Sequence, residues 1–461
     1  MIFNRENLPA VPSSWATVRV DEACTLVSVR EKIQTKDYLN EGSLAVVDQG
    51  SALVGGYWDN ASKAVDTELP VVVFGDHTRA LKFVDFPFAA GADGIKVLRP
   101  SALFHPRLFY RFLEAIKPPS RGYARHFQLL RDSQIPVPPL SEQKRIADKL
   151  DTVLARVDAC RDHLDRVPAI LKRFRQSVLA AAISGKLTEE WRAGSGKTTD
   201  VRSLVFEEDS VAIPKHWHDY PLTELIDSQR PLCYGVVQPG EAATDGVPLV
   251  RVQDMERGTV NLHGLRTVSA DVDAEYRRSR VKSGDLLVSV VGTIGRTAIV
   301  PSGFKANIAR AVARIACRGG VDSRWVNIWL TSDELQWWMT RSSREVARKT
   351  LNLSELSAAR VAVPPFDEQL EIVRRVESLF AWADRLEARH AAARAHVERL
   401  TPALLAKAFR GELVPQDPAD EPASELLERL GQRPADNPTG LPKPQGAKRS
   451  RANAAQAASR A

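Results

Sequence analysis

Cysteine, methionine and long apolar runs are scarce in this sequence. Its 461 residues include four cysteines and three methionines, and the cysteines (Cys24, Cys160, Cys233 and Cys317) lie far apart without a Cys-x-x-Cys pair. This excludes a disulfide scaffold and a cysteine-built zinc site, and it favours free thiols in a reducing compartment. No apolar run approaches about 18 residues, and Glu6 stands where a secretion signal would be hydrophobic. We therefore expect a soluble, cytoplasmic chain without a membrane partner.

The signatures of common enzymes are missing as well. Gly194-Ser-Gly-Lys-Thr198 resembles a phosphate-binding loop, but that loop requires glycine at position 191, which is Trp191. Val363-Pro-Pro-Phe366 resembles the adenine-binding loop of amino-methyltransferases, but it lacks the polar first residue, and no glycine-rich S-adenosylmethionine loop occurs. His216-x-His218 has no third ligand at a suitable spacing for a metal. We expect a binding protein, not an enzyme, without a catalytic, metal or cofactor site of its own.

The charge is unevenly distributed. Apolar residues make up 44% and charged residues 26% of the chain, which is ordinary for a protein that forms a core. The formal net charge is +7, but five of these charges come from a run without acids in the last nineteen residues: Lys443, Lys448, Arg449, Arg451 and Arg460. The rest of the chain is nearly neutral at +2. Overall charge alone therefore does not identify a nucleic-acid partner.

The chain contains an internal repeat. The motif at 138–143, Pro-Pro-Leu-Ser-Glu-Gln, recurs 226 residues later as Pro-Pro-Phe-Asp-Glu-Gln at 364–369. Gly-Lys-Leu at 185–187 recurs as Gly-Glu-Leu at 411–413, again 226 residues later. Pro-Ser-Ser-Trp at 12–15 recurs as Pro-Lys-His-Trp at 214–217, so the second globular segment is about 24 residues longer than the first. The layout predicts a globule and a rod, written twice.

Each rod is predicted to be one long helix. Apolar residues alternate at steps of four and three, which is typical of a coiled-coil seam. Ser141 and Asp367 are suitable N-cap residues for the two helices, and Gly185 and Gly411 are suitable C-terminal stops. Roughly 43 residues would give rods of about 65 Å, which we expect to pair antiparallel. A generic helical spacer remains an alternative. The seam residues are Ile146, Leu150, Val157, Leu164, Leu171, Phe174, Ile372, Val376, Leu379, Leu386, Val397 and Leu400, with His390 as a polar exception and Pro168 as a possible kink.

The expected fold class is α+β, with two α/β globular domains alternating with the two long helices. Short β-branched runs separated by Gly and Asp predict strands and turns in each globular domain. The predicted boundaries are 1–140 for the first domain, 141–187 for the first helix, 188–213 for a linker, 214–366 for the second domain, 367–413 for the second helix, and 414–461 for a disordered tail rich in Pro, Ala, Gln, Arg and Lys.

Polar loop residues of both domains are the candidate contact residues. The loop Gly292-Thr-Ile-Gly-Arg296 follows an apolar strand and can bring backbone N–H groups and a guanidinium to a phosphate or a guanine edge, although an ordinary hairpin turn is the alternative. Gln, Asn and Arg can make bidentate contacts with base edges, although single polar loop residues are often only solvated. The candidates are Gln49, His77, Arg79, Tyr123, Arg125, His126, Tyr234, Gln238, Arg251, Gln253, Arg296, Arg348, Lys349 and Asn352.

Over nearly all of residues 1–430, the chain resembles the DNA-specificity (S) subunit of type I restriction–modification systems. The resemblance rests on the doubled Pro-x-x-Trp, Pro-Pro-x-x-Glu-Gln and Gly-x-Leu motifs, on 73–79 with 91–94 in the first domain, and on 234–240, 284–287 and 292–296 in the second. It implies two target recognition domains, each of which reads one part of a split, asymmetric DNA site. The helices would hold them apart, and the family's S subunit is itself non-catalytic.

The resemblance also implies the partners. These are double-stranded DNA, two modification subunits that carry S-adenosylmethionine and methylate adenine N6, and restriction subunits that use ATP and Mg²⁺ to translocate and cut DNA. The outward faces of 142–184 and 368–410 would contact the modification subunits. A non-catalytic coiled-coil adaptor whose domains bind proteins is the competing hypothesis. A single-chain restriction enzyme has no room, since each globule has only about 140 residues and no cofactor loop.

Overall fold

The structure is a computed structural model that describes residues 9–116, 118, 125–196, 200–206, 209–345 and 349–431. The chain forms two compact units. Unit 1 combines residues 1–160 with 396–461, and unit 2 comprises residues 161–395. Described residues from before α4 (Leu140–Ile183) and from after α10 (Phe366–Phe409) therefore build unit 1 together. Within the described ranges, no helix combines the length and the apolar character needed to cross a membrane.

Unit 1 contains two small sheets and a pair of joining strands. The larger sheet has the order β2-β8-β5-β6 and the smaller one β4-β3-β7. Val71, Val73 and Val97 pack with neighbours of both sheets in a buried cluster. The strands are β1 (Ala16–Arg19), β2 (Cys24–Val27), β3 (Leu44–Val47), β4 (Gly56–Trp58), β5 (Val71–Gly75), β6 (Leu81–Val84), β7 (Phe88–Ala90), β8 (Ile95–Pro100) and β9 (Gln134–Val137), and the helices are α1 (Val20–Ala23), α2 (Pro106–Ala115) and α3 (Phe127–Arg131).

Unit 2 has a six-stranded sheet of order β13-β21-β18-β19-β16-β15 and a three-stranded sheet of order β17-β14-β20. Trp217, Trp325 and Trp329 lie fully buried in its largest apolar cluster. The strands are β12 (His218–Pro221), β13 (Cys233–Tyr234), β14 (Val247–Val250), β15 (Met255–Glu256), β16 (Gly258–Val260), β17 (Arg266–Val268), β18 (Leu286–Ser289), β19 (Thr297–Ile299), β20 (Asn307–Ile308), β21 (Val312–Ile315), β22 (Arg344–Glu345), β23 (Lys349–Thr350) and β24 (Arg360–Val363). The helices are α6 (Ala270–Glu275), α7 (Ser323–Leu330), α8 (Asp333–Arg341) and α9 (Leu353–Ala358).

Two helices of 44 residues each, α4 (Leu140–Ile183) and α10 (Phe366–Phe409), follow the two Pro-Pro motifs. Gly185 and Gly411 come just after the helices and have positive φ angles of 72° and 74°. A Cβ added at Gly185 would lie 2.5 Å from Pro214 Cγ, and one at Gly411 would lie 2.6 Å from Pro12 Cγ. The repeated Gly and the repeated Pro therefore meet across the repeat, which explains why both motifs occur twice.

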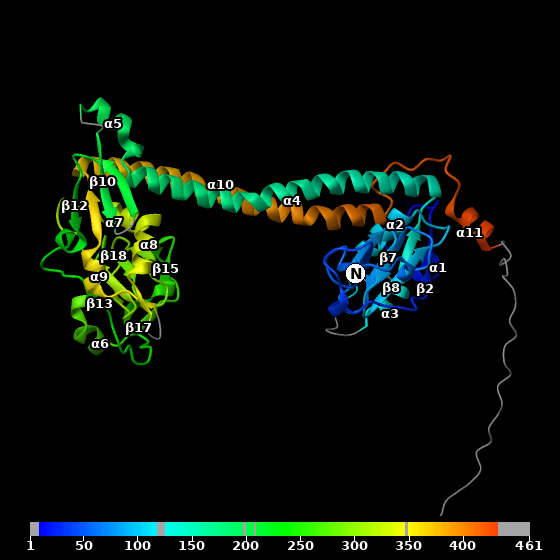
Figure 1. Ribbon diagram of the computed structural model, residues 1–461, viewed down its shortest axis with the longest axis horizontal. Coiled ribbons are helices and arrows are strands. Elements are labelled where there is room, and N and C mark those ends of the chain that lie inside the picture. The colour runs from blue at the N-terminus through cyan, green and yellow to red at the C-terminus, as the bar shows by residue number, and fades with distance from the viewer. Residues whose placement is uncertain are drawn as a thin grey trace, which may run out of the picture. The chain divides into compact units, whose positions relative to one another are not determined.

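α4 and α10 pack against each other antiparallel, which confirms the predicted fold class (Figure 1). In unit 2, the Phe174 and Trp382 rings lie 5.4 Å apart, and Arg175 pairs with Asp384 at 2.7 Å. In unit 1, Leu150 and Phe409 share one buried cluster. Of the twelve seam residues, seven are buried (Ile146, Leu150, Val157, Leu171, Ile372, Val376 and Val397) and five are partly buried (Leu164, Phe174, Leu379, Leu386 and Leu400).

The repeated Glu-Gln pair fastens each long helix to its globular domain. Gln143 accepts a hydrogen bond from His105 N at 2.7 Å, and its counterpart Gln369 accepts one from Asp322 N at 2.9 Å. Each Gln amide also donates to the first proline carbonyl of its own motif, at 2.8 Å and 2.9 Å. The Gln side chains are buried. Because a buried amide is costly unless it is bonded, these bonds fix where each helix leaves its domain.

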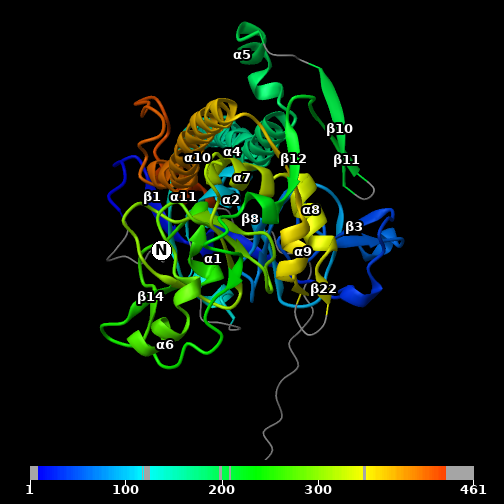
Figure 2. The ribbon, with the colours of Figure 1, turned by 90° about the vertical axis from the view of Figure 1, so that its left-hand side faces the viewer.

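The predicted linker 188–213 is wrong. It contains α5 (Glu189–Gly194) and most of a hairpin formed by β10 (Val201–Phe206) and β11 (Asp209–Pro214). In Figure 2 the hairpin and α5 lie beside the ends of α4 and α10 that belong to unit 2. Leu204, Phe206, Val211 and Ile213 alternate along the two strands and are buried in the unit 2 core. This alternation of apolar residues predicts two strands, but the Gly- and Thr-rich stretch at 194–199 favoured the interpretation as a linker.

The prediction of a disordered tail from 414 onward is wrong for its first part. Helix α11 (Ala423–Gly431) follows the end of α10, and its Ala423 and Leu426 are buried in the unit 1 core. Arg145 of α4 pairs with Asp420 at 2.6 Å, which ties the segment before α11 to the start of the long helix. Residues 432–461, which carry the basic run, lie outside the described residues.

Candidate functional site

Three loops of unit 1 bring Gln49 and His77 together. Gln49 follows β3, and His77 lies in the turn between β5 and β6. The Thr78 hydroxyl donates to the Gln49 carbonyl at 2.6 Å. A Cβ added at Gly94 would lie 2.7 Å from His77 Cδ2 and 3.2 Å from Gln49 Oε1. Gly94, with φ of 78°, therefore permits the close approach of the two side chains.

Arg79 lies in the same β5–β6 turn. Its side chain is exposed, and Nη1 donates to the Pro118 carbonyl at 2.9 Å. It lines a cavity of about 360 Å³ together with Phe74, Leu81 and Ile116. Thr78, which bonds the Gln49 carbonyl, lines the same cavity and connects Arg79 to His77 in the chain.

His126 is a correction to the candidate set. Its side chain is fully buried, its backbone N–H donates to Asp76 Oδ1 at 2.8 Å, and Nδ1 lies 2.9 Å from the Asp76 carbonyl. The next backbone N–H, of Phe127, also donates to Asp76 Oδ1 at 2.8 Å. His126 therefore holds the start of α3 and cannot reach a ligand outside. Arg125 is exposed, whereas Tyr123 lies outside the described residues.

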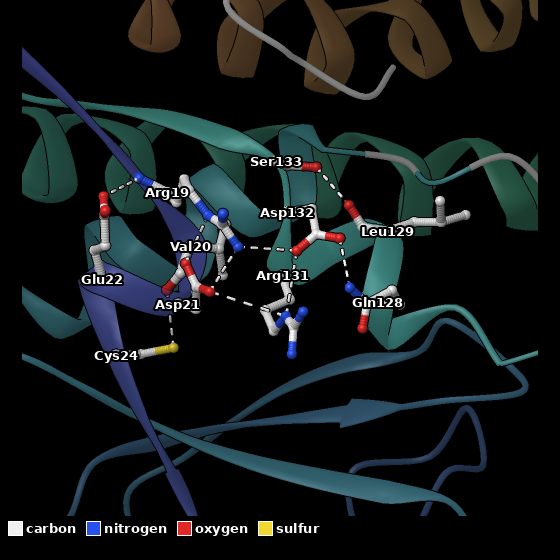
Figure 3. Close-up of polar contacts among 10 residues, drawn as sticks. All are labelled: Arg19, Val20, Asp21, Glu22, Cys24, Gln128, Leu129, Arg131, Asp132 and Ser133. Carbon is white, nitrogen blue, oxygen red and sulfur yellow. Dashed lines mark hydrogen bonds and ion pairs between the residues drawn. The ribbon is translucent and has the colours of Figure 1, made fainter.

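A polar network joins the end of α3 to the end of β1 in unit 1 (Figure 3). Arg19 reaches Asp21 at 2.7 Å and Asp132 at 3.0 Å, while Arg131 lies 3.2 Å from Asp132. Burial raises the pKa of Asp132, but hydrogen bonds from Gln128 and Arg131 and the charges of Arg131 and Arg19 outweigh it and hold that pKa below its usual value. The network holds α3, and the exposed Arg125 precedes this helix by two residues in the chain.

In unit 2 the loop 292–296 is the centre of a second cluster. Gly292 N donates to the Lys349 carbonyl at 2.8 Å, which places the loop against β23. Arg296 is exposed, and its Nη1 donates to the Val252 carbonyl at 3.2 Å. Since Gln253 is the exposed neighbour of Val252, the structure brings Arg296, Gln253 and Lys349 onto adjoining loops.

Three candidates of unit 2 have local bonding roles. Arg251 forms a two-pronged contact with Asp254 at 3.0 Å and 2.9 Å, and that hydrogen-bonded carboxylate raises the pKa of Arg251 above its usual value. Asn352 is the N-cap of α9, and its backbone N–H donates a hydrogen bond to Glu355 Oε2 at 2.9 Å. The Tyr234 hydroxyl accepts a bond from Leu353 N at 3.2 Å. These side chains shape the loops that carry the exposed candidates. Gln238 is exposed in the loop after β13, and Arg348 lies outside the described residues.

Arg257 is a residue that the sequence reasoning missed. Together with Arg296 it lines a cavity of about 650 Å³, whose other walls include Gly258, Thr331 and Gln336. Its side chain is 78% exposed, and Nη2 lies 3.6 Å from Glu387. Arg257 and Gly258 stand where β15 turns back into β16, and apart from the glycine the sequence gives no sign of this turn.

The two clusters share side chains that can donate several hydrogen bonds. Exposed guanidinium, amide and ammonium groups can donate to phosphate oxygens and to base edges. Across the part of the chain that the structure describes, no group of three or more His, Cys, Asp or Glu side chains is arranged to hold a metal ion.

Comparisons with known proteins show which family the chain resembles. Residues 12–167 match the family described as the type I restriction modification DNA specificity domain. The chain is 48% identical over 310 residues to the type I restriction enzyme EcoBI specificity subunit of Escherichia coli, over 65% of this chain and 64% of that protein, so it spans less than two thirds of that relative's length. It is 30% identical to the EcoDI specificity subunit of Escherichia coli, over 65% of this chain and 69% of that protein.

A solved structure has the same fold. The HsdS subunit from Thermoanaerobacter tengcongensis superposes with a TM-score of 0.51 at 18% identity, over 89% of this chain and all of that chain. At this level of identity the likeness concerns the fold.

Proposed function

This chain belongs to the family of type I restriction enzyme specificity subunits, and we propose that it reads the DNA sequence for a type I restriction–modification complex. Its two globular domains would each recognise one part of a split, asymmetric site. The observation that carries the proposal is the doubled layout, in which the same Trp, Glu-Gln and Gly motifs attach two domains with different loops to one antiparallel helix pair.

The two loop clusters supply the reading groups in this proposal. Gln49 and His77 in unit 1, and Gln253, Arg296 and Lys349 in unit 2, would face base edges or phosphates. The long helices would set the number of unread base pairs between the two half-sites. Half-sites on one face of B-DNA lie about 34 Å apart, and a 44-residue helix is about 66 Å long.

The partners follow from the same role. Two modification subunits would bind the outward faces of α4 and α10, supply S-adenosylmethionine and methylate adenine. Restriction subunits would use ATP and Mg²⁺ to translocate and cut unmodified DNA. The chain itself would be non-catalytic and would act in the cytoplasm.

Sequencing the methylated bases of the native cell before and after deletion of the gene tests the proposal. We expect one split adenine-methylation motif to disappear and to return when the gene is restored on a plasmid. If every split motif persists after deletion, the proposal fails. A pull-down of the tagged chain from the native cell is a second test. If the proteins that co-purify include no methyltransferase chain, the result favours the adaptor hypothesis.

A further inference from the structure

Arg79 and Arg257 share an unusual backbone conformation. Within the described ranges they are the only residues other than glycine with a positive φ, 63° for Arg79 and 48° for Arg257. A Cβ atom makes positive φ angles unfavourable for residues other than glycine. Non-glycine residues with positive φ are therefore concentrated at functional sites. One of the two arginines lies in the globular domain of each unit, and each lies in a turn between neighbouring antiparallel strands.

Arg257 occupies the first position of a two-residue turn. Met255 pairs with Val260 and Glu256 with Thr259, so Arg257 and Gly258 form the turn with φ angles of 48° and 80°. Positive φ at both central positions defines a type I′ turn, for which Asn-Gly is strongly preferred. Arginine does not help this turn to form. Its presence indicates a role for the side chain, which is 78% exposed beside Arg296 at the cavity of about 650 Å³.

Arg79 occupies the corresponding kind of position in unit 1. Its N–H donates to the Gly75 carbonyl at 2.7 Å, and Gly75 N donates to the Ala80 carbonyl at 2.8 Å, which closes the turn. The side chain is exposed, and one nitrogen is bonded to the Pro118 carbonyl. Like Arg257, Arg79 is adjacent to predicted reading groups, here Gln49 and His77.

We propose that Arg79 and Arg257 each contact a backbone phosphate of the DNA. The inference rests on the proposed function and adds to it Arg257, which the sequence did not single out, and a role distinct from base reading for both residues. A guanidinium stays charged at all relevant pH values and matches two phosphate oxygens. Each turn joins two antiparallel strands, and a phosphate contact from it would fix the register of the neighbouring reading groups on the duplex.

The test uses the full chain with its modification subunits and a long duplex of random sequence. Arg257→Asn and Arg79→Asn place a residue that tolerates positive φ in each turn, so both variants should fold at least as well as the wild type. Each removes one phosphate contact. We expect the slope of log affinity against log salt to fall by about 0.9 per variant, which corresponds to an affinity loss of about 8-fold at ~0.1 M salt. The loss should be equal on a duplex that contains the recognised site.

Matched variants separate the phosphate contact from other effects. Arg257→Lys keeps the charge and should keep the salt slope. Arg99→Gln removes one positive charge from β8, where the inference places no phosphate contact, and it should change neither slope nor affinity. In the double variant Arg79→Asn with Arg257→Asn, the salt slope should fall by the sum of the decreases in the two single variants.

Three results would overturn the inference. The first is a wild-type slope in both Asn variants while the wild-type complex binds DNA, which leaves the proposed function standing. The second is a loss confined to the recognised site, which would make the arginines base readers. The third is a wild-type complex that binds no DNA, which removes the proposed function and this inference together.

Discussion

The imidazole Nε2 of His390 lies 2.9 Å from the carbonyl oxygen of Leu164, its counterpart in the repeat 226 residues earlier. That carbonyl would normally accept from the backbone N–H of residue 168, four positions on, but residue 168 is Pro168, which has none. His390 of α10 thus satisfies the acceptor that Pro168 leaves open in α4. The one polar residue in the seam and the one proline inside α4 are explained by each other.

This relationship predicts coupling between positions 168 and 390. His390→Leu should destabilise the wild type by about 1 kcal/mol, because it leaves a partly buried carbonyl unpaired. In a Pro168→Ala background the N–H of residue 168 can bond Leu164, so the same substitution should cost nothing or stabilise the seam. A double-mutant cycle by urea unfolding measures this coupling. Equal costs in the two backgrounds would contradict the pairing.

Two equivalent carboxylates should respond differently to removal of their charge. Trp15 donates to Glu142 at 2.9 Å and Trp217 to Glu368 at 3.2 Å, but only Glu368 also pairs with a buried cation, Arg192 at 2.8 Å. Glu368→Gln strands that guanidinium and should cost about 3 kcal/mol of unfolding free energy, while Glu142→Gln should cost under about 1 kcal/mol. Urea unfolding of both variants at pH 7 makes the comparison. Similar losses would show that Arg192 does not depend on Glu368.

The same pair predicts opposite pH dependences. Burial raises the pKa of Glu142 above its usual 4.5, against hydrogen bonds from Trp15 and Gln416. Burial also acts to raise the pKa of Glu368, but hydrogen bonds from His216, Arg192, Thr188 and Trp217 outweigh it and lower that pKa below 4.5. Ionised Glu142 therefore costs stability above its folded pKa, and this cost disappears as the pH falls towards 4.5. Glu368 contributes stability that is complete above 4.5 and is lost as the pH falls through its folded pKa.

Unfolding free energies of the wild type and the two Gln variants between pH 7 and pH 3 test these signs. As the pH falls from 7 to about 4.5, the unfolding free energy of the wild type should rise relative to that of Glu142→Gln. The wild type should remain more stable than Glu368→Gln over this interval and lose that difference in unfolding free energy only below about pH 4.5. If the wild type instead becomes less stable relative to Glu142→Gln between pH 7 and about 4.5, the pKa of Glu142 is lowered and not raised.

Helix α11 should matter for the stability of unit 1. Leu426 is 4% exposed in the unit 1 core, so Leu426→Ala should cost about 2–3 kcal/mol. Glu428→Ala on the exposed face of the same helix is the matched control and should change stability by less than about 0.5 kcal/mol. Thermal unfolding of the full chain measures both. Equal melting temperatures for the two variants would mean that α11 does not hold unit 1 together.

The sequence predicted those parts of the fold that depend on residues close together in the chain. The heptad steps and the Pro-Pro and Gly boundaries marked α4 and α10, because they reflect local geometry. The return of the chain's end to unit 1 depends on contacts such as Arg145 with Asp420, which lie 275 residues apart and leave no local signal. The role of His390 likewise needed the register between the two helices.

The candidate site was predictable in residue type but not in role. Arg, Asn, His and Tyr also make the bonds that hold turns, so the sequence could not separate Arg296 from the buried His126. One separation was readable, since Asn352 with Glu355 three residues on is a capping box. Arg257 was missed because its positive φ follows from strand register, which the sequence alone does not show.

The independence of the two domains gives the last prediction. The contacts that hold Gln49 and His77 come from Thr78 and Gly94 of the same domain. Replacing residues 1–140 with the first domain of another specificity subunit should therefore change one half of the methylated site and leave the other half and the spacer unchanged. Arg296→Ala, in the other domain, should weaken only the half-site that the exchange leaves intact. Sequencing of methylated bases in cells carrying each variant reads both results. A change in both halves after the exchange would mean that the domains do not read independently, and an unchanged second half-site in Arg296→Ala would remove that arginine from the reading surface.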